Sequence, residues 1–228
     1  MPPPSAVVQA FDAHADAYDR SVEPLQAVKD LVHQLIRSQL SGLPDGARIL
    51  VVGAGTAAEA RFLAPRFPGW RFTLADPSEQ MLGVGRRHAE AEGFADRCRF
   101  HPGFVASLAD EPYDAAISVL VSHFLTDAGD RTAYFGDIAA HLKPGGLLFT
   151  ADLCADLTAP SFGAVMELWL TLAGTPEARR DSFRTAFGRD FAVHGPAEVE
   201  AMISAAGFSA PAACFQAALV RGWVAARP

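Results

Sequence analysis

Two glycines and one acid in the first third of the chain have the types and the spacing that a nucleotide pocket needs. An apolar run ends at Val52 and breaks into Gly53 and Gly55, and Asp76 ends the next apolar run. A turn built on glycines approaches a ligand closely, and an acid about 20 residues further on can accept hydrogen bonds from both ribose hydroxyls. The pattern therefore predicts that a strand, a turn and a helix together bind a nucleotide.

The elements that would position these residues follow an alternating order. We expect an entry helix over residues 22–40 and strands at 48–52, 71–75, 98–101, 113–119 and 147–151. Helices are expected at 57–64, 79–92 and 130–142, and a turn at Lys143-Pro144-Gly145-Gly146 stops the last of them. This alternation is typical of a doubly wound, Rossmann-like, mostly parallel α/β sheet.

The last third of the chain departs from this alternation. Helices are expected at 161–172, 175–187 and 196–206, and two apolar runs follow at 212–217 and 219–225. Strands with so short a spacer can pair only as an antiparallel hairpin, which would bring the sheet to seven strands. The insertion at 156–194 should lie over the carboxyl ends of the parallel strands as a small helical lid.

Composition limits the classes of function. The 228 residues, half of them apolar, suffice for one core, so we expect a single domain over 1–228 with N-terminal helices at 5–44. A formal charge of −7 argues against a nonspecific grip on nucleic-acid phosphates. The three cysteines lack zinc or disulfide spacing, and no apolar run has the length of a membrane span. A soluble, cytoplasmic protein is expected.

Five motifs in order give nearly the whole chain a resemblance to the class I S-adenosylmethionine (SAM) dependent methyltransferases. They are the glycine turn at 53–56, Asp76-Pro77-Ser78 with Met81, the fourth strand at 113–118, the turn at 142–146, and Ala206-Gly207-Phe208 before the closing hairpin. The resemblance implies SAM as the cofactor. It also implies methyl transfer to a small organic acceptor by in-line displacement.

The expected cofactor site combines these motifs with aromatic residues. Tyr18 is expected to cap the methionine end of the cofactor, and Phe104 to stack on its adenine, with a place in the core as the alternative for Phe104. The expected cofactor-binding residues are Tyr18, Gly53, Ala54, Gly55, Asp76, Pro77, Ser78, Met81, Phe104, Val105 and Val119.

Three positions depart from the family pattern. The family usually has glycine where Ala57 stands and an acid where Val51 stands, and it commonly has an acid for the adenine amino group where this chain has Phe104. The acid replaced by Val51 often supports the methionine amino group of the cofactor. Another group of this chain must therefore take its place, or cofactor affinity falls.

Candidate residues for the acceptor side are fewer. His123, just after the fourth strand, could take a proton from the acceptor, with a structural histidine as the alternative. Asp152 and Asp156 follow the fifth strand, but the fourth strand offers no matching acid, so no metal is expected. In the lid, Trp169 and its apolar neighbours indicate either an apolar substrate surface or packing against the main domain.

Other readings of the same residues stay open. Segments near both ends are similar to the enzymes that modify the tRNA wobble uridine with carboxy-SAM, and Arg184 or Arg189 would then bind the extra carboxylate, or else be solvated helix charges. A nicotinamide dehydrogenase is suggested by Gly-x-Gly-x-x-Ala at 53–58, and a SAM-binding protein without catalysis is a further alternative. The expected partner is a small molecule, with tRNA as the alternative and no membrane. The sequence leaves open whether the protein forms a homodimer.

Overall fold

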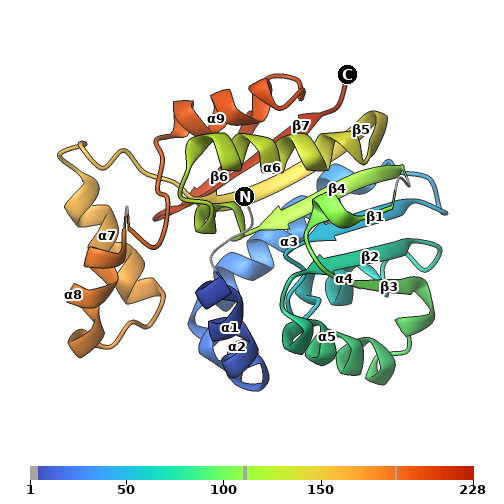
Figure 1. Ribbon diagram of the computed structural model, residues 1–228, viewed down its shortest axis with the longest axis horizontal. Coiled ribbons are helices and arrows are strands. Elements are labelled where there is room, and N and C mark those ends of the chain that lie inside the picture. The colour runs from blue at the N-terminus through green and yellow to red at the C-terminus, as the bar shows by residue number, and fades with distance from the viewer. Residues whose placement is uncertain (1–4, 110–111, 188) are drawn as a thin grey trace.

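The computed structural model describes residues 5–109, 112–187 and 189–228, which form one seven-stranded sheet (Figure 1). The strand order is β3-β2-β1-β4-β5-β7-β6, and only β7 runs antiparallel to its neighbours β5 and β6. The strands are β1 (Arg48–Val52), β2 (Arg71–Asp76), β3 (Cys98–Pro102), β4 (Tyr113–Val119), β5 (Leu142–Leu153), β6 (Ala212–Ala217) and β7 (Val220–Ala226). The predicted Rossmann-like sheet with an antiparallel end is confirmed.

Each face of the sheet buries its own core, because successive strand residues point to opposite faces. On β1, Ile49 and Val51 belong to the first core, whereas Leu50 and Val52 belong to the second. The first core is covered by α3 (Gln26–Leu40), α4 (Ala58–Leu63) and α5 (Glu79–Ala91), and the second by α6 (Ala128–Ala140) and α9 (Pro196–Ala205). Burial on both faces explains why the strands read as unbroken apolar runs.

The remaining helices lie around the carboxyl ends of the parallel strands. The N-terminal helix α1 (Ser5–His14) packs against α5, and the short α2 (Tyr18–Ser21) follows it. The lid helices α7 (Phe162–Leu172) and α8 (Glu177–Ala186) project beyond the sheet at the left of Figure 1. Within the described ranges, no helix combines the length and the apolar composition of a membrane span.

Three predicted boundaries were wrong. Strand β5 begins at Leu142, because the predicted turn at 143–146 is an irregularity inside the β4–β5 ladder, between the pairs Tyr113–Leu142 and Ala115–Leu147. Helix α3 begins at Gln26 and is preceded by a 3-10 turn that contains Pro24. Helix α6 begins two residues early, because the Asp127 carboxylate caps it by accepting a 3.0 Å bond from the Asp130 N–H.

Candidate functional site

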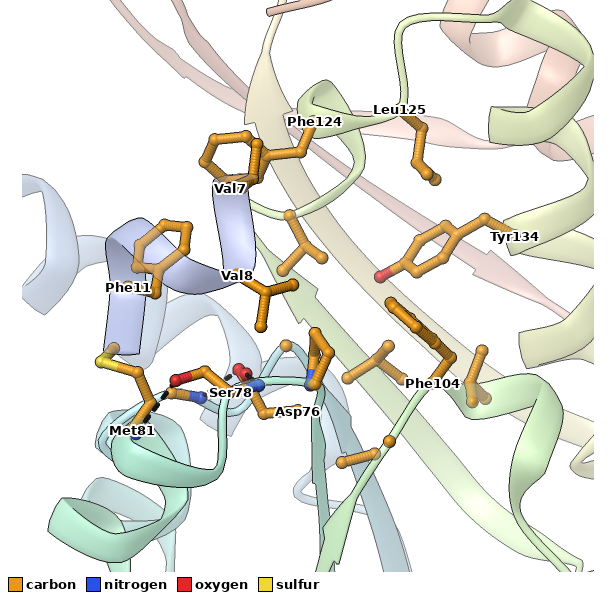
Figure 2. Close-up of a pocket in the computed structure, with 18 of the residues that line it drawn as sticks. Val7, Val8, Phe11, Asp76, Ser78, Met81, Phe104, Phe124, Leu125 and Tyr134 are labelled. Atoms are coloured by element: carbon orange, nitrogen blue, oxygen red, sulfur yellow. Dashed lines mark hydrogen bonds between the residues drawn. The ribbon is translucent and has the colours of Figure 1, made fainter. Parts of the chain in front are cut away.

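A cavity of about 290 Å³ opens at the carboxyl ends of the parallel strands (Figure 2). The ends of β1, β2 and β4, helix α1, the segment after β3 and helix α6 contribute to its lining. In open α/β sheets this crevice is where ligands bind. The predicted cofactor residues that line it are Tyr18, Gly53, Gly55, Asp76, Pro77, Ser78, Met81, Phe104, Val105 and Val119.

The glycine turn has the backbone that its sequence indicates. Gly53 and Gly55 have φ values of +66° and +50°, which glycine adopts without a steric penalty. A Cβ on Gly53 would lie 2.3 Å from Cγ2 of Val121, so a side chain has no room there. Ala54, predicted to bind the cofactor, is buried in the first core and does not line the cavity. Ala57, where the family usually has glycine, also has a positive φ of +66°.

Asp76 at the end of β2 is oriented by two backbone groups. Its Oδ2 accepts a 2.8 Å hydrogen bond from Gly55 N–H, and its Oδ1 accepts a 2.8 Å bond from Ser78 N–H. Burial raises the pKa of Asp76, the two N–H groups oppose that shift, and Asp12 adds to it. Because each carboxylate oxygen has a second acceptor position, the carboxylate can still bind two ligand hydroxyls.

A second acid, Asp12 on α1, lies next to this site and was not predicted. Its Oδ1 accepts a 2.6 Å hydrogen bond from the Ser78 hydroxyl, which in turn caps α5 by accepting a 3.1 Å bond from Met81 N–H. Helix α1 is thereby fixed to the start of α5, with Phe11 lining the cavity. No local pattern in the sequence marked this acid, because its partner Ser78 lies 66 positions away.

Tyr18 lines the cavity near the glycine turn. Burial raises the pKa of Tyr18 to about 12, and the carboxylates of Glu59, Asp19 and Asp76 add to the shift. Asp19 holds this segment in place, because its Oδ1 accepts a 2.7 Å bond from the Thr56 hydroxyl. The Tyr18 hydroxyl is therefore a neutral donor surrounded by negative charge.

The wall opposite α1 is aromatic. Figure 2 shows Phe104 and Tyr134 side by side, with Tyr134 contributed by α6. The Tyr134 hydroxyl shares a 2.7 Å hydrogen bond with the Ser118 hydroxyl at the end of β4. Tyr134 was missed because nothing in the sequence of α6 distinguishes a cavity-lining tyrosine from a core tyrosine.

His123 does not line the cavity but belongs to a buried polar network behind it. Its Nδ1–H donates to Oδ1 of Asp152, whose Oδ2 accepts from the Ser122 hydroxyl. Arg131, fully buried, donates from Nε to Ser122 and from Nη1 to the carbonyl of Ala192 in the lid. Burial alone would raise the pKa of Asp152, but His123 and Arg131 hold it at about 2.

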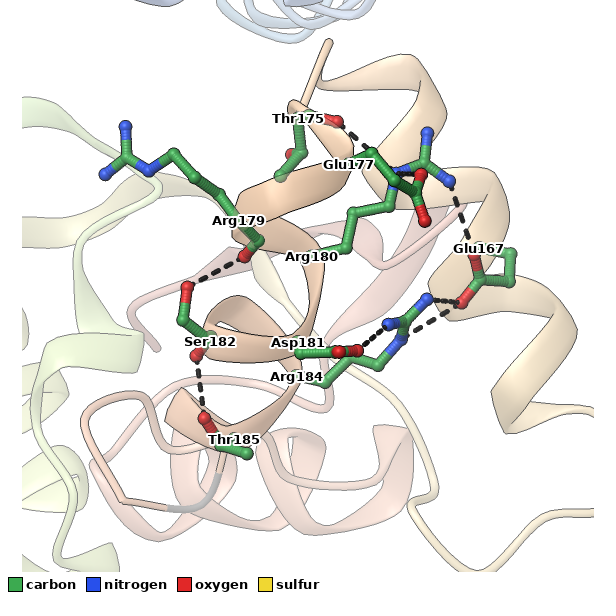
Figure 3. Close-up of polar contacts among 9 residues, drawn as sticks. All are labelled: Glu167, Thr175, Glu177, Arg179, Arg180, Asp181, Ser182, Arg184 and Thr185. Atoms are coloured by element: carbon green, nitrogen blue, oxygen red, sulfur yellow. Dashed lines mark hydrogen bonds and ion pairs between the residues drawn. The ribbon is translucent and has the colours of Figure 1, made fainter.

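The two lid arginines also lie away from the cavity lining. Arg184 pairs with Glu167 of α7 and Asp181, and Arg180 joins the same glutamate (Figure 3). Arg189 pairs with its neighbour Asp190 at 2.6 Å. The described lining of the cavity contains no arginine and no lysine.

Trp169 of α7 packs in the first core, with its ring Nε1 buried and without a hydrogen-bond acceptor among the described residues. It lines a small second recess, not the main cavity. Asp156, near the same end of the sheet, binds the backbone and hydroxyl of Thr158. Within the described ranges, no group of three or more His, Cys, Asp or Glu side chains is arranged to hold a metal ion.

Comparisons with known proteins agree with this geometry. Residues 50–148 match a family model described as a methyltransferase domain. The chain is 42% identical over 95 residues to the release factor glutamine methyltransferase of Chlorobaculum tepidum, covering 39% of this chain and 32% of that protein. It is 31% identical over 165 residues to the ubiquinone biosynthesis O-methyltransferase of Methylocella silvestris, covering 67% and 62%. The solved structure of the mitomycin 7-O-methyltransferase MmcR superposes with a TM-score of 0.65 and 20% identity, covering 97% and 60%.

The chain spans about a third and three fifths of the length of these two curated relatives. At 20% identity, the likeness to MmcR shows the fold alone. The matched segment, however, runs from β1 into β5 and includes the glycine turn, Asp76 and Val119. The segment predicted to bind the nucleotide is thus the one that matches, and the chain carries the methyltransferase domain and the fold of the class I SAM-dependent methyltransferases.

Proposed function

We propose that this protein transfers the methyl group of SAM to a small organic acceptor. The observation that carries the proposal is the Asp76 carboxylate, which two backbone N–H groups orient beside the glycine turn at one end of a largely apolar cavity. An oriented acid at this place suits a ribose, and the glycines leave room for a ligand close to the backbone.

The residues of the cavity fit the parts of SAM. Asp76 would accept the ribose hydroxyls, Phe104 and Val105 would contact the adenine, and Tyr18 would close over the methionine end near Gly53. When bound, SAM supplies a methyl group already activated by its sulfonium. The protein's own task is to align the acceptor with that methyl group and to exclude water.

The acceptor side of the cavity is apolar. Val7, Val8 and Phe11 of α1 line the space above Asp76 in Figure 2 together with Phe124 and Leu125, and the rings of Phe11 and Phe124 are in edge-to-face contact. Such walls favour an apolar or aromatic acceptor over a charged one. The name of the relative in ubiquinone biosynthesis, an O-methyltransferase, supports a small organic acceptor.

His123 is proposed as the proton acceptor where the acceptor atom is a hydroxyl. With Nδ1 bound to Asp152, only Nε2 is left to take a proton. The imidazole contacts the ring of Phe124, at 4.1 Å between ring centroids, and Phe124 lines the cavity. The lid residue Phe191 covers the imidazole from another side, so lid movement would control its access.

Mass spectrometry of small molecules released from the freshly purified protein tests the proposal first. Retained SAM or S-adenosylhomocysteine (SAH), or micromolar binding of SAH in a titration, is the expected result. A nicotinamide dinucleotide in the released fraction would contradict the assignment. Turnover is then tested with a panel of hydroxylated aromatic acceptors, and binding of SAH without turnover on any of them would favour a SAM-binding protein that does not catalyse transfer.

The cavity also bears on the carboxy-SAM alternative. The extra carboxylate of that cofactor needs a cation, and the described lining offers no arginine or lysine. Arg184 and Arg189 are each engaged by acidic neighbours in the lid. We therefore propose SAM, and a released mass higher by one carboxylate would overturn that choice.

A further inference from the structure

Leu120, the residue after β4, has a left-handed backbone with a φ of +58°. In this region the side chain of any residue other than glycine crowds its own backbone, so Leu120 is strained. The neighbouring glycine turn avoids such strain, since the residues with φ values of +66° and +50° there are Gly53 and Gly55. Strain of this kind persists only where the surrounding structure imposes it, and it is found mostly at functional sites.

Two consecutive residues of β5 impose the conformation of Leu120. The Leu120 N–H donates a 2.7 Å hydrogen bond to the carbonyl of Ala151, which continues the β4–β5 ladder beyond the end of β4. The His123 N–H donates a 3.1 Å bond to Oδ2 of Asp152, the next residue of β5. Because the segment is tied to neighbouring residues of one strand at both of these points, the chain has to turn sharply between them.

The half-buried Leu120 side chain lies between two spaces. It lines the main cavity, and it also lines a second recess of about 20 Å³, which has room for roughly one water molecule. Helix α3, the first turn of α4 and lid helix α7 contribute to this recess, α7 through Trp169. Among the described residues, only Val119 lines both spaces as well. A glycine at position 120 would therefore leave Val119 alone to separate them.

The segment that contains Leu120 also packs directly on the glycine turn. A Cβ on Gly53 would lie 2.3 Å from Cγ2 of Val121, the residue after Leu120. This is the end of the main cavity to which the proposed function assigns the methionine part of SAM. In-line methyl transfer requires that this end be held in one position and that water be kept out. The Leu120 side chain is placed to do both, because it closes the cavity towards the recess.

We propose that Leu120 is a positioning residue for methyl transfer, and that its side chain is the wall that closes the reaction space towards α3 and α7. Glycine would relax the turn but would join the two spaces, so the wall requires a side chain on a left-handed backbone. The strain and the wall can be tested without a cofactor. The effect on the cofactor rests on the proposed function, in which that cofactor is SAM.

The first test concerns the strain alone. Leu120→Ala and Leu120→Gly both remove most of the side chain, but only glycine relaxes the left-handed backbone. Leu120→Gly should therefore unfold at a higher urea concentration than Leu120→Ala. The matched control is the next residue, Val121, whose φ is −120°, and there the glycine variant should unfold at a lower urea concentration than the alanine variant. A Leu120→Ala variant that is as stable as Leu120→Gly would overturn the proposal.

The second test concerns the wall and uses acrylamide, a neutral quencher of tryptophan fluorescence that is similar in size to a leucine side chain. Quenching in the wild type should be weak and should not depend on SAH, because all three tryptophans are buried. Quenching in Leu120→Gly should be stronger, and SAH should suppress the increase by filling the main cavity. Trp169→Phe in the Leu120→Gly background should abolish the increase. An increase that SAH does not suppress would indicate general loosening and would overturn the proposal.

A conservative variant completes the experiment. Leu120→Met keeps a side chain of similar volume, so it should resist acrylamide as the wild type does and bind SAH within about twofold of the wild type, whereas Leu120→Gly should bind SAH about 3- to 10-fold more weakly. If Leu120→Met behaves like Leu120→Gly, the side chain does not act as a wall. A wild-type protein that does not bind SAH would overturn the SAM assignment, while unfolding in urea and quenching without SAH would still test the strain and the wall.

Discussion

The Ser78 hydroxyl at the start of α5 donates a 2.6 Å hydrogen bond to the Asp12 carboxylate on α1. Asp12→Ala should therefore release α1 from the cavity. Hydrogen exchange over residues 5–14 should become faster, and cofactor affinity should fall by about 1 to 2 kcal/mol. Asp16→Ala is the control, because its pair with Arg87 is mostly exposed. Equal exchange in the two variants would contradict the role given to Asp12.

Asp76→Ala should weaken SAH binding by about 1.5 to 3 kcal/mol through loss of a charge-assisted ribose contact. Calorimetric titration measures this directly. SAH affinity equal to that of the wild type would contradict the placement of the ribose.

Asp76 should also lower the free energy of unfolding at neutral pH. Because burial raises the pKa of Asp76 in the folded state, its contribution to stability is greatest below the unfolded pKa of about 3.9 and is lost as pH rises through the folded pKa. Asp76→Asn removes the carboxylate and with it this loss of stability. In urea unfolding at pH 7 the variant should therefore be more stable than the wild type, although it should bind SAH more weakly. A less stable variant at pH 7 would indicate that the hydrogen bonds from Gly55 and Ser78 outweigh burial.

Gly53→Ala should lower the free energy of unfolding by more than the backbone penalty of a positive φ alone. Gly93 has a φ of +75° with open space around it, so Gly93→Ala measures the backbone penalty, about 1 to 2 kcal/mol. At Gly53 the added methyl group also meets Val121, which should cost about 1 to 3 kcal/mol more and reduce cofactor binding. Chemical denaturation of both variants provides the comparison, and equal losses would show that Val121 moves aside.

Arg131→Met should leave the Asp152 charge buried without its cation and lower the free energy of unfolding by about 3 to 5 kcal/mol. Arg87→Met, which removes an exposed pair, should change it by less than about 1 kcal/mol. The wild type should also lose stability as pH falls from about 4 towards 2, since the folded pKa of Asp152 is about 2. Asp152→Asn should not show this acid-dependent loss of stability. If its stability falls with pH as that of the wild type does, the role given to the buried network is wrong.

His123→Asn should lower kcat by about 100- to 10,000-fold with a hydroxyl acceptor if the imidazole takes the proton. SAH affinity should not change, because His123 does not line the cofactor cavity. Single-turnover kinetics with saturating cofactor separates this effect from binding. If the His123→Asn variant reacts as fast as the wild type at pH 7, His123 is only a structural partner of Asp152.

The parts of the fold that the sequence predicted are those specified locally. The glycine turn, Asp76 and the hairpin depend on backbone conformation, charge and spacer length within short segments, and the structure has them where expected. The turn at 143–146 was misplaced because pairing with β4, a long-range interaction, draws it into the strand.

The site was less predictable where distant segments meet. Asp12 reaches Ser78 across 66 positions of sequence, and Arg131 reaches the lid carbonyl of Ala192 across 61. Neither pairing has a local sequence pattern, because both depend on how helices pack on the finished sheet. For the same reason, Tyr134 was missed and Ala54 was assigned to a cavity that its side chain does not line.

The lid leaves and rejoins the sheet at adjoining points, where Ala155 N–H donates a 3.1 Å bond to the His194 carbonyl. An insertion whose two ends are neighbours can change in length or sequence at little cost to the elements that it joins. Natural variation in this insertion can therefore alter acceptor choice while the sheet, the glycine turn and Asp76 stay constant. For protein engineering, the exposed part of the lid can be replaced, provided that Met166, Trp169 and Leu170 keep their packing in the first core.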